Sequence, residues 1–414
     1  MRQDGVSFAS IVFNASKVSR MIAKAARQGE YQFEPATLRE IKVEGKKRTV
    51  FSLNLTDTIL HGAVADLIEE AHRAELSPRV FSYRKGVSWW TPTTQFASYV
   101  RSHRKQHADL KDRGLYVLRR DIDSYTDSIP VDGKSQIWAL LKDALDIDGT
   151  TSIESSADWS IVEQVVRPVA HFPNGPIFSL VRGVPTGQPI SCVLFNMYLK
   201  DLDSELGKIQ GAFYARYCDD ILFAHPEAKV AEEAGLLASQ MLSNLRIRFN
   251  AKKKQNIYLN DAGRPPVEWE NFRGSTQVEF LGLQVSSAGT TRLSRRKQRS
   301  LLRELEDRAV RTAKSLNTND TDRIGRTVCS VINRALEPNG GLFQQRSATL
   351  VRKCITDRQQ LGQIDYLLAR LVLYAVTGSR NVRMFRSISY QKIRNEWGLV
   401  SLLHSRNKWG KSRQ

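Results

Sequence analysis

The most constraining feature of this sequence is a predicted β-hairpin with two adjacent carboxylates at its tip. Two β-prone runs, 212–217 and 221–224, are separated only by Cys218, Asp219 and Asp220, a spacing typical of a tight hairpin. Aspartate is a common turn residue, so this pair taken alone is equally typical of an ordinary turn. A functional interpretation therefore depends on the acids elsewhere in the chain.

A third carboxylate stands at the end of another predicted strand. The run LYVLRRDI (115–122) is typical of a buried strand and carries Asp121 near its end. Carboxylates from two separate segments suit a pair of magnesium ions about 3.5 to 4 Å apart, which activate an attacking oxygen and stabilise a leaving one. Hard oxygen ligands select Mg²⁺ and leave coordination positions for substrate phosphates. Asp121, Asp219 and Asp220 therefore indicate phosphoryl-transfer chemistry, with two Mg²⁺ ions as the cofactor.

The remaining patterns predict a mixture of helices and strands. A helix is expected from residue 56 onward, with Thr56 or Asp57 as its N-cap, and others at 135–145 and 191–199. The pattern predicts a basic amphipathic helix and then a strand within 231–258, and one strand for VEFLGLQV (278–285). Beyond Ser294 the apolar spacing is helical, and helices are expected over 295–316, 322–335 and 361–376.

The positive charge is concentrated in the last third of the chain. The net charge is +19; residues 291–414 hold 26 Lys and Arg against 9 Asp and Glu, whereas residues 1–290 hold 36 against 34. Such a surplus favours a polyanionic partner through counterion release. A solvated, highly soluble surface is the alternative, but nearly one-sided charge among apolar helices is better explained by nucleic acid.

Several protein classes are unlike this sequence. No stretch approaches the roughly 20 apolar residues of a membrane span, and the start MRQDGVSFAS lacks the apolar core of a secretory signal. The four cysteines are widely spaced and the histidines form no cluster near them, which argues against a disulfide framework or a zinc site. We expect a cytoplasmic protein with no membrane partner.

Five blocks of the sequence carry a resemblance to a known family. The blocks LRRDIDSYTDSI, RGVPTGQPISCVLFNMYL, RYCDDILFA, RFNAKKKQNIY and VEFLGL resemble, in order, the successive blocks of reverse transcriptases, over roughly 42–285. The resemblance implies an α+β fold of the right-hand polymerase type, with fingers and palm followed by a basic all-helical thumb and C-terminal bundle. The implied domains are an N-terminal segment and fingers (1–114), a palm with embedded fingers elements (115–290), and a basic helical thumb with a C-terminal RNA-binding extension (291–414).

The same resemblance assigns roles to individual residues of an RNA-directed DNA polymerase. Asp121, Asp219 and Asp220 would be catalytic and hold the two Mg²⁺ ions, together with the backbone carbonyl of Ile122. The implied contacts to the incoming dNTP are Lys47, Arg48, Tyr125, Thr126, Gln188 and Lys253. The implied contacts to template or primer are Arg84, Lys85, Gly187, Tyr217, Gly282, Arg295, Arg296 and Lys297.

Some of these roles have a physical reason, an alternative or a departure from the family beside them. Lysine as a point charge and arginine as a fork both suit a triphosphate, but the stretch 45–48 is also typical of an exposed basic turn. Gly187 lets the backbone approach a ligand closely, although the family usually has glutamine at Thr186 and proline at Cys192. Lys252 or Lys254 could take the role of Lys253.

The position that selects the sugar departs from the family. Reverse transcriptases place a bulky aromatic residue five positions after the first catalytic acid, where it excludes a 2′-hydroxyl. Here that position is Thr126, with Tyr125 beside it. Either the register shifts by one residue or sugar discrimination is unusual, so a DNA product is implied by the family and not by these residues.

Within the family, the chain most resembles the bacterial defence-associated reverse transcriptases of the type 2 group. That resemblance implies a cytoplasmic bacterial enzyme that copies a structured noncoding RNA repeatedly into concatenated cDNA, in defence against phage. The terminal HSRNKWGKSRQ, with Trp409 among cations, would belong to the RNA-binding surface or form a soluble tail. Two alternatives are a template-independent or protein-primed polymerase of the abortive-infection type, and a maturase-like RNA-binding protein without catalysis.

Overall fold

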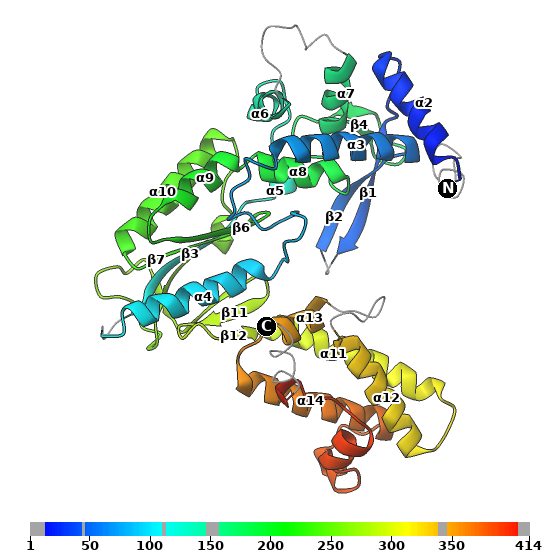
Figure 1. Ribbon diagram of the computed structural model, residues 1–414, viewed down its shortest axis with the longest axis vertical. Coiled ribbons are helices and arrows are strands. Elements are labelled where there is room, and N and C mark those ends of the chain that lie inside the picture. The colour runs from blue at the N-terminus through cyan, green and yellow to red at the C-terminus, as the bar shows by residue number, and fades with distance from the viewer. Residues whose placement is uncertain (1–12, 44–45, 110–112, 146–156, 338–345, 405–414) are drawn as a thin grey trace. The chain divides into compact units, whose positions relative to one another are not determined.

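The computed structural model (Figure 1) describes residues 13–43, 46–109, 113–145, 157–337 and 346–404. The chain forms two compact units, Met1–Trp89 with Tyr116–Asn256 and Trp90–Leu115 with Ile257–Gln414. The fold is mixed α+β with a helical C-terminal region. Within the described residues, no helix has the length and apolar character needed to cross a membrane. The three-domain division at 114/115 and 290/291 stays a prediction.

One sheet of the first unit has four strands in the order β2-β1-β4-β5. β1 (Ala36–Val43) and β2 (Lys46–Ser52) are antiparallel neighbours. β4 (Val169–His171) runs parallel to β1 and antiparallel to β5 (Phe178–Ser179). The basic stretch that the sequence singled out therefore lies on the edge strand β2.

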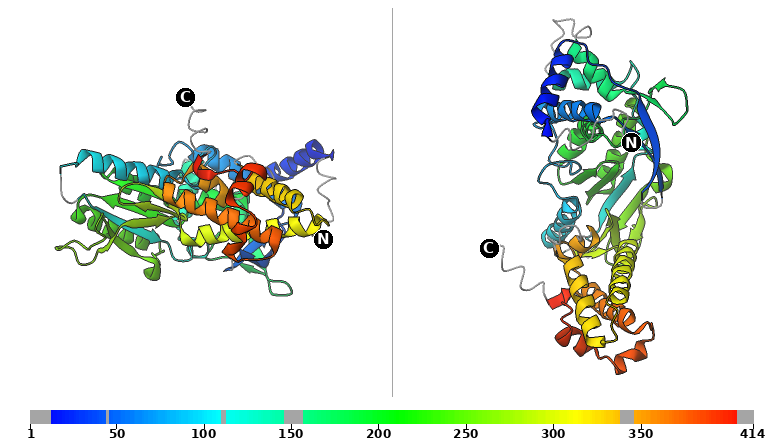
Figure 2. Two further views of the ribbon diagram at one scale, coloured as in Figure 1. Left: turned by 90° about the horizontal axis from the view of Figure 1, so that it is seen from below. Right: turned by 90° about the vertical axis from the view of Figure 1, so that its right-hand side faces the viewer.

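A second sheet of this unit carries the predicted hairpin. β6 (Phe213–Tyr217), β7 (Asp220–His225) and β3 (Leu115–Asp121) lie in the order β6-β7-β3, all antiparallel. The helices α9 (Lys200–Lys208) and α10 (Ala228–Asn244) cover these strands (Figures 1 and 2). The strands expected at 115–122, 212–217 and 221–224 are confirmed.

The helix expected at the start of 231–258 is α10, and its predicted basic character is wrong. Its charged residues are Lys229, Glu232 and Glu233, and the basic residues follow the helix instead. Small buried residues bring α10 close to the sheet: a Cβ on Gly235 would lie 3.1 Å from Leu118 Cδ1. The helix is positioned by small side chains and not by a cationic face.

The helix expected from residue 56 is α3 (Leu55–His72), but the N-cap prediction is wrong. The cap is Asn54, whose side-chain oxygen accepts a hydrogen bond of 2.7 Å from the backbone N–H of Asp57. Asp57 is buried within the first turn, where its carboxylate accepts a 2.8 Å hydrogen bond from the hydroxyl of Tyr31. Thr56 and Asp57 therefore follow the cap, and the carboxylate of Asp57 bonds Tyr31 instead of capping the helix.

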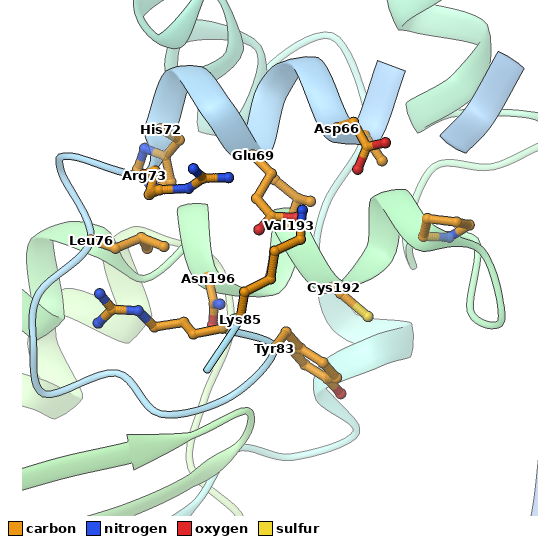
Figure 3. A pocket seen from close by; sticks show the side chains of 13 residues that line it. Asp66, Glu69, His72, Arg73, Leu76, Tyr83, Lys85, Cys192, Val193 and Asn196 are labelled. Carbon is orange, nitrogen blue, oxygen red and sulfur yellow. The ribbon is translucent and has the colours of Figure 1, made fainter. Parts of the chain in front are cut away.

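Two further helices of the first unit confirm the predictions for 135–145 and 191–199. α6 (Gln136–Ala144) is capped by Ser135, and α8 (Pro189–Met197) begins with a proline in its first turn. α8 is buried and packs against α3, and a cavity of about 290 Å³ opens between them and the segment 83–85 (Figure 3). The remaining described helices of this unit are α2 (Ala15–Arg27), α5 (Tyr125–Ser128), α7 (Ala157–Val166) and η2 (Ala251–Lys253).

The second unit joins one helix and several short strands to the C-terminal helices. α4 (Thr91–Gln106) belongs to it, as does the parallel pairing of β8 (Gln255–Leu259) with β9 (Arg273–Ser275) from Ile257 onward. A three-stranded antiparallel sheet follows, in the order β10-β11-β12. Its strands are β10 (Gln277–Phe280), β11 (Leu283–Ser286) and β12 (Thr291–Leu293).

The prediction of one strand for 278–285 is wrong, because the run contains a hairpin turn. Leu281 and Gly282 both have positive φ, of 51° and 79°, and join β10 to β11. Two central residues with positive φ are typical of a type I′ turn, which matches the twist of the paired strands. The leucine at the first position makes the segment look like a continuous apolar strand.

The C-terminal helices agree with the sequence over most of their length. α11 (Arg295–Ser315), α12 (Thr321–Leu336) and α14 (Arg358–Thr377) confirm the three expected helices, each capped by a Ser or Asp side chain. α13 (Arg346–Lys353) was not predicted. Short turns η4 (Val382–Arg386) and η5 (Lys392–Glu396) follow α14.

Candidate active site

The two carboxylate segments meet at one end of the β6-β7-β3 sheet. β3 pairs with β7 so that Asp121 lies directly opposite Asp220. The backbone N–H of Ile122 donates a 3.1 Å hydrogen bond to the carbonyl of Asp219. Sheet pairing thus brings together acids separated by about a hundred residues of sequence, as a shared site requires.

The backbone of Ile122 is placed beside the same acids. Ile122 forms an isolated bridge with Phe249, through hydrogen bonds from Asp123 N–H to Arg248 O (2.9 Å) and from Asn250 N–H to Asp121 O (2.8 Å). This bridge uses the carbonyls of Asp121 and Arg248 and leaves that of Ile122 outside it. The side chain of Ile122 is buried, so its carbonyl is the group that it can offer to the site.

The turn between Tyr217 and Asp220 is held by a buried polar network that sequence reasoning missed. Cys218 has a φ of 57°, which is costly for a residue with a side chain. Its N–H donates to Ser82 Oγ at 3.0 Å, and its carbonyl accepts from Arg216 Nη1 at 3.2 Å. These two bonds hold the strained residue between Tyr217 and the Asp219–Asp220 pair.

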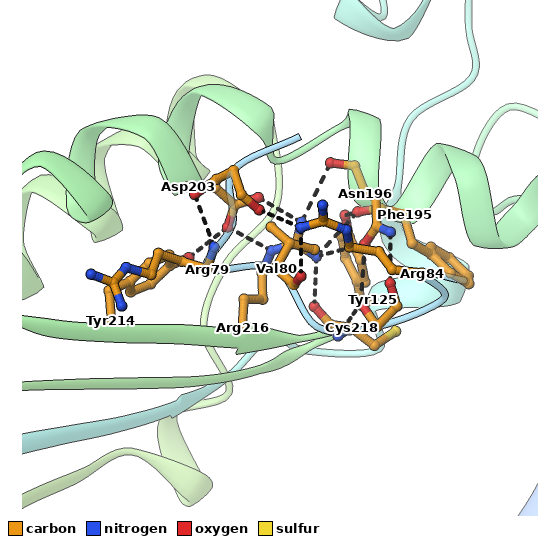
Figure 4. Close-up of polar contacts among 12 residues, drawn as sticks. Arg79, Val80, Arg84, Tyr125, Phe195, Asn196, Asp203, Tyr214, Arg216 and Cys218 are labelled. Atoms are coloured by element: carbon orange, nitrogen blue, oxygen red, sulfur yellow. Dashed lines mark hydrogen bonds and ion pairs between the residues drawn. The ribbon is translucent and has the colours of Figure 1, made fainter. Parts of the chain in front are cut away.

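A fully buried ion pair supports that network (Figure 4). Arg216 and Asp203 have side chains 0% and 1% exposed, with Nη2 and Oδ2 2.6 Å apart. Burial lowers the pKa of Arg216, but the charge and hydrogen bonds of Asp203 outweigh it and raise the pKa above its ordinary value. Tyr214 donates a 2.6 Å hydrogen bond to Asp203 as well. The sequence signal was an arginine inside the otherwise apolar strand run FYARY.

The electrostatics of the acids show three negative charges crowded together. Burial and then the charge of Asp219 raise the pKa of Asp220 from 3.8 to about 6. Burial and then the charge of Asp121 raise the pKa of Asp219, while the cations Lys253 and Arg48 oppose that rise. Lys253 Nζ lies 2.6 Å from Asp121 Oδ2. The site therefore favours an added positive charge.

The donor set fits a magnesium ion held partly by substrate. In the described residues, no three His, Cys, Asp or Glu side chains converge so as to hold a metal by themselves. Mg²⁺ is usually bound through one or two carboxylates plus water and substrate phosphates, and it selects hard oxygen ligands of this kind. A cation would also relieve the repulsion that raises the pKa of Asp219 and Asp220. Asp121, Asp219 and Asp220 are the residues that would hold it.

The predicted triphosphate cations on β2 differ in their surroundings. The side chain of Lys47 is 79% exposed and pairs with Glu40 at 2.8 Å, a hydrogen bond that raises the pKa of Lys47. Arg48 is exposed, and its positive charge opposes the rise in the pKa of Asp219. Gly45 lies outside the described residues, as does Trp409. Arg48 and Lys253 are therefore the predicted cations that the structure relates to the acids.

The turn before α8 packs against β2. Gly187 has a φ of 97°, and a Cβ added there would lie 3.5 Å from Val50 Cβ. The side-chain amide of Gln188 donates a 2.8 Å hydrogen bond to the carbonyl of Phe51, and Gln188 is buried. This hydrogen bond joins the turn to β2, and it engages the side-chain amide of Gln188 that was predicted to contact the nucleotide.

Tyr125 lies in the core, which corrects its expected role at the nucleotide. The ring is 2% exposed and its hydroxyl donates a 2.8 Å hydrogen bond to the carbonyl of Phe195 in α8. The left-handed residue Ser124 (φ 47°) precedes the short helix that carries it. Thr126, the next residue, is partly exposed. Of the two sugar-gate alternatives, only Thr126 has a side chain at the surface.

Two predicted template residues of the first unit, Arg84 and Lys85, border the cavity between α3 and α8. The guanidinium of Arg84 donates hydrogen bonds to the carbonyls of Ser77 and Val80, so it supports its own loop. Lys85 is exposed and lines the cavity (Figure 3). Tyr83 lies between the cavity and the hairpin, with its ring 6.5 Å from that of Tyr217.

The predicted primer residues of the second unit gather at the β10–β11 turn and α11. A Cβ added to Gly282 would lie 2.8 Å from Lys297 Cγ, so Lys297 packs on this turn. Arg295 and Arg296 line an open groove of about 600 Å³ on the same unit. Two more exposed arginines, Arg299 and Arg303, line the same groove at helical spacing, and they were not predicted from the sequence.

Comparison with known proteins supports the family suggested by the motifs. Residues 41–285 match the protein family described as reverse transcriptase (RNA-dependent DNA polymerase). No curated protein matches the sequence significantly. Among solved structures, apo telomerase from Candida tropicalis lacking its C-terminal domain is similar at 13% identity and a TM-score of 0.47, covering 71% of this chain and 63% of that one.

Two other telomerase structures give similar values. Full apo telomerase from Candida tropicalis shows 11% identity and a TM-score of 0.49, covering 92% of this chain and 73% of that one. Telomerase from Candida albicans, in complex with a fragment of telomeric RNA, shows 11% identity and a TM-score of 0.45, covering 97% and 68%.

Proposed function

The chain belongs to the reverse transcriptase family, whose activity is RNA-directed DNA polymerisation, and from this premise we propose that Asp121, Asp219 and Asp220 are its catalytic residues. The observation that supports this most is the pairing of Asp121 with Asp220 across β3 and β7, with Asp219 hydrogen-bonded to Ile122. Two Mg²⁺ ions held there would activate the primer hydroxyl and stabilise the leaving pyrophosphate.

The side chains around the acids suggest how the nucleotide is bound. Arg48 and Lys253 supply positive charge to the acids, and both suit the triphosphate of an incoming dNTP. Lys253 would exchange its contact with Asp121 for the phosphates. Thr126 would face the sugar, and a threonine there leaves more room than an aromatic ring.

We propose that the template is a structured noncoding RNA dedicated to this enzyme, copied repeatedly into concatenated cDNA in defence against phage. The uneven charge supports a protein that retains one RNA, since residues 291–414 hold 26 Lys and Arg against 9 acids. A large cationic surface can recognise the shape and phosphates of a folded RNA. The arginines along α11 are the first candidates for those contacts.

Primer extension on an RNA template tests the catalytic assignment. The double variant Asp219→Ala/Asp220→Ala should lose dNTP incorporation while keeping its affinity for RNA, because the acids carry the chemistry and the cations carry the binding. Glu205→Gln is the matched control, since Glu205 is an exposed carboxylate paired with Lys208 on the surface of α9. Unchanged incorporation by the double variant would contradict the assignment.

Sequencing the nucleic acids that copurify with the protein tests the template. One RNA accompanied by tandem cDNA copies of it would support the proposal. DNA of random sequence would instead favour template-independent or protein-primed synthesis. A bound RNA without any incorporation by the wild-type protein would favour a maturase-like role.

A further inference from the structure

The end of the helical region carries a cluster of aromatic rings at its surface. Tyr366 of α14 stacks on Phe385 of η4, with ring centroids 6.0 Å apart and planes inclined by 27°. Phe385 in turn lies 6.5 Å from Tyr390. Tyr366 and Tyr390 are 44% and 39% exposed. Each of these two tyrosines therefore keeps an accessible part of its ring beside Phe385, and a ligand with flat faces could stack there.

The aromatic surface continues along α14. Tyr366, Arg370 and Tyr374 are spaced by four residues, which places them on one face of the helix. The guanidinium of Arg380 lies 4.3 Å from the ring centre of Tyr374 and is ion-paired with Glu306. These side chains, apart from Tyr366, line a cavity of about 190 Å³.

Positive charge accompanies the rings. Residues 358–404 contain seven Lys and Arg but only two acids, Asp365 and Glu396. Asp365 is buried and engaged, because it accepts hydrogen bonds from the backbone N–H of Leu402 and Leu403 and pairs with Arg394. It therefore adds little negative charge to the surface.

Two arginines lie next to the rings on η4. The 3₁₀ geometry repeats every three residues, so Val382 and Phe385 share one face and Arg383 and Arg386 share another. Arg383 and Arg386 are exposed, and no carboxylate of the described residues forms an ion pair with either. Flat rings beside unneutralised arginines match the bases and phosphates of a nucleic acid strand.

We propose that Tyr366, Tyr374, Phe385 and Tyr390, here called the aromatic track, bind an unpaired segment of nucleic acid. Its bases would stack on the rings, and Arg383 and Arg386 would contact its phosphates. Stacking needs exposed base faces, so the track selects single strands over duplex. The inference rests on the proposed function in one respect, namely that the bound strand is either the RNA template or the cDNA.

A binding assay in catalytically inactive protein tests the track. The Asp219→Ala/Asp220→Ala protein is first saturated with an unlabelled blunt RNA–DNA duplex, so that the polymerase site is occupied. A fluorescent 12-nucleotide single strand, as RNA or as DNA, is then titrated by anisotropy at several salt concentrations. A fluorescent blunt duplex is titrated separately, into protein without the unlabelled duplex. Tyr366→Ala/Tyr374→Ala should weaken single-strand binding about 5- to 100-fold without changing duplex binding.

Matched variants separate stacking from charge. Tyr366→Phe/Tyr374→Phe keeps both rings and should bind single strands as the parent protein does. Arg383→Gln/Arg386→Gln should reduce the salt dependence of binding by about 1.4 logarithmic units per tenfold salt, whereas the alanine pair should leave it unchanged. The stronger single-stranded probe identifies the strand as RNA or DNA.

Three results would overturn the proposal. The first is that Tyr366→Ala/Tyr374→Ala binds single strands with an affinity within twofold of the parent protein. The second is that this variant loses as much affinity for duplex as for single strands, and the third is that Tyr366→Phe/Tyr374→Phe binds single strands more weakly than the parent protein. If the alanine pair fails to fold, crosslinking of a 4-thiouridine strand to the parent protein decides, with crosslinks expected at the track and none there counting against it. Primer extension by the wild-type protein is measured separately, so loss of the track and loss of polymerase activity remain distinguishable.

Discussion

Replacing Asp220 by asparagine should stabilise the metal-free protein, and only where the carboxyl is ionised. Burial and the charge of Asp219 raise the pKa of Asp220 from 3.8 to about 6. A rise of that size corresponds to about 3 kcal/mol of unfavourable free energy for the ionised form in the folded state. Because Asp220 is partly exposed, we expect a gain of about 1 to 3 kcal/mol in Asp220→Asn at neutral pH.

The pH dependence gives this prediction its sign. A carboxyl whose folded pKa is raised contributes most stability below its unfolded pKa, and that contribution is lost as the pH rises through the folded value. Asparagine does not ionise, so the stability difference between Asp220→Asn and wild type should be small near pH 4. The difference should grow between about pH 4 and 6 and level off above.

Urea unfolding followed by circular dichroism, in EDTA at pH 4.5, 5.5 and 7.5, measures this difference. Added Mg²⁺ should reduce the gain, because a cation stabilises the ionised carboxylates of the wild type more than those of the variant. Glu205→Gln, which removes an exposed carboxylate, should change stability by less than about 0.5 kcal/mol at every pH. A gain that is independent of pH, or a loss of stability at pH 7.5, would refute the reasoning.

Two more substitutions test the packing around the site and in the helical region. Asp203→Asn leaves the fully buried Arg216 without its counter-ion and should lower the free energy of unfolding in urea by about 3 to 5 kcal/mol. Glu205→Gln on the same helix should be nearly neutral, and equal effects of the two substitutions would mean that the ion pair does not hold the turn. Gly325→Ala in α12 should destabilise the protein although alanine favours helices, because the added Cβ would lie 2.2 Å from the Trp397 ring. Gly362→Ala in α14 is the control: its Cβ would lie 4.0 Å from the nearest atom, so the free energy of unfolding should rise by about 0.5 to 1 kcal/mol. A gain in both variants would contradict the packing.

Local patterns in the sequence were sufficient for the elements of the site. Strand and turn propensities placed Asp121 at a strand end and Asp219 at a hairpin tip, and five ordered blocks gave the family. Helical spacing with Ser and Asp caps gave three of the C-terminal helices. These features depend on neighbours within a few residues, which the sequence states directly.

Long-range contacts were decided only by the tertiary structure. The sequence did not show that Tyr125 points into the core, that Tyr31 holds the buried carboxylate of Asp57, or that Leu281 begins a turn. Each depends on partners far along the chain or on a backbone angle that apolar patterning does not encode.

The three aspartates show the same division. Their positions at strand and hairpin ends follow from local sequence, but the pairing that sets Asp121 opposite Asp220 is a property of the sheet. The raised pKa of Asp219 and of Asp220 follows from burial and from charges that only the folded chain brings together. The sequence determined which acids we propose as catalytic, and the tertiary structure decided their pKa, because the electrostatic cost of an ionised acid depends on what surrounds it in space.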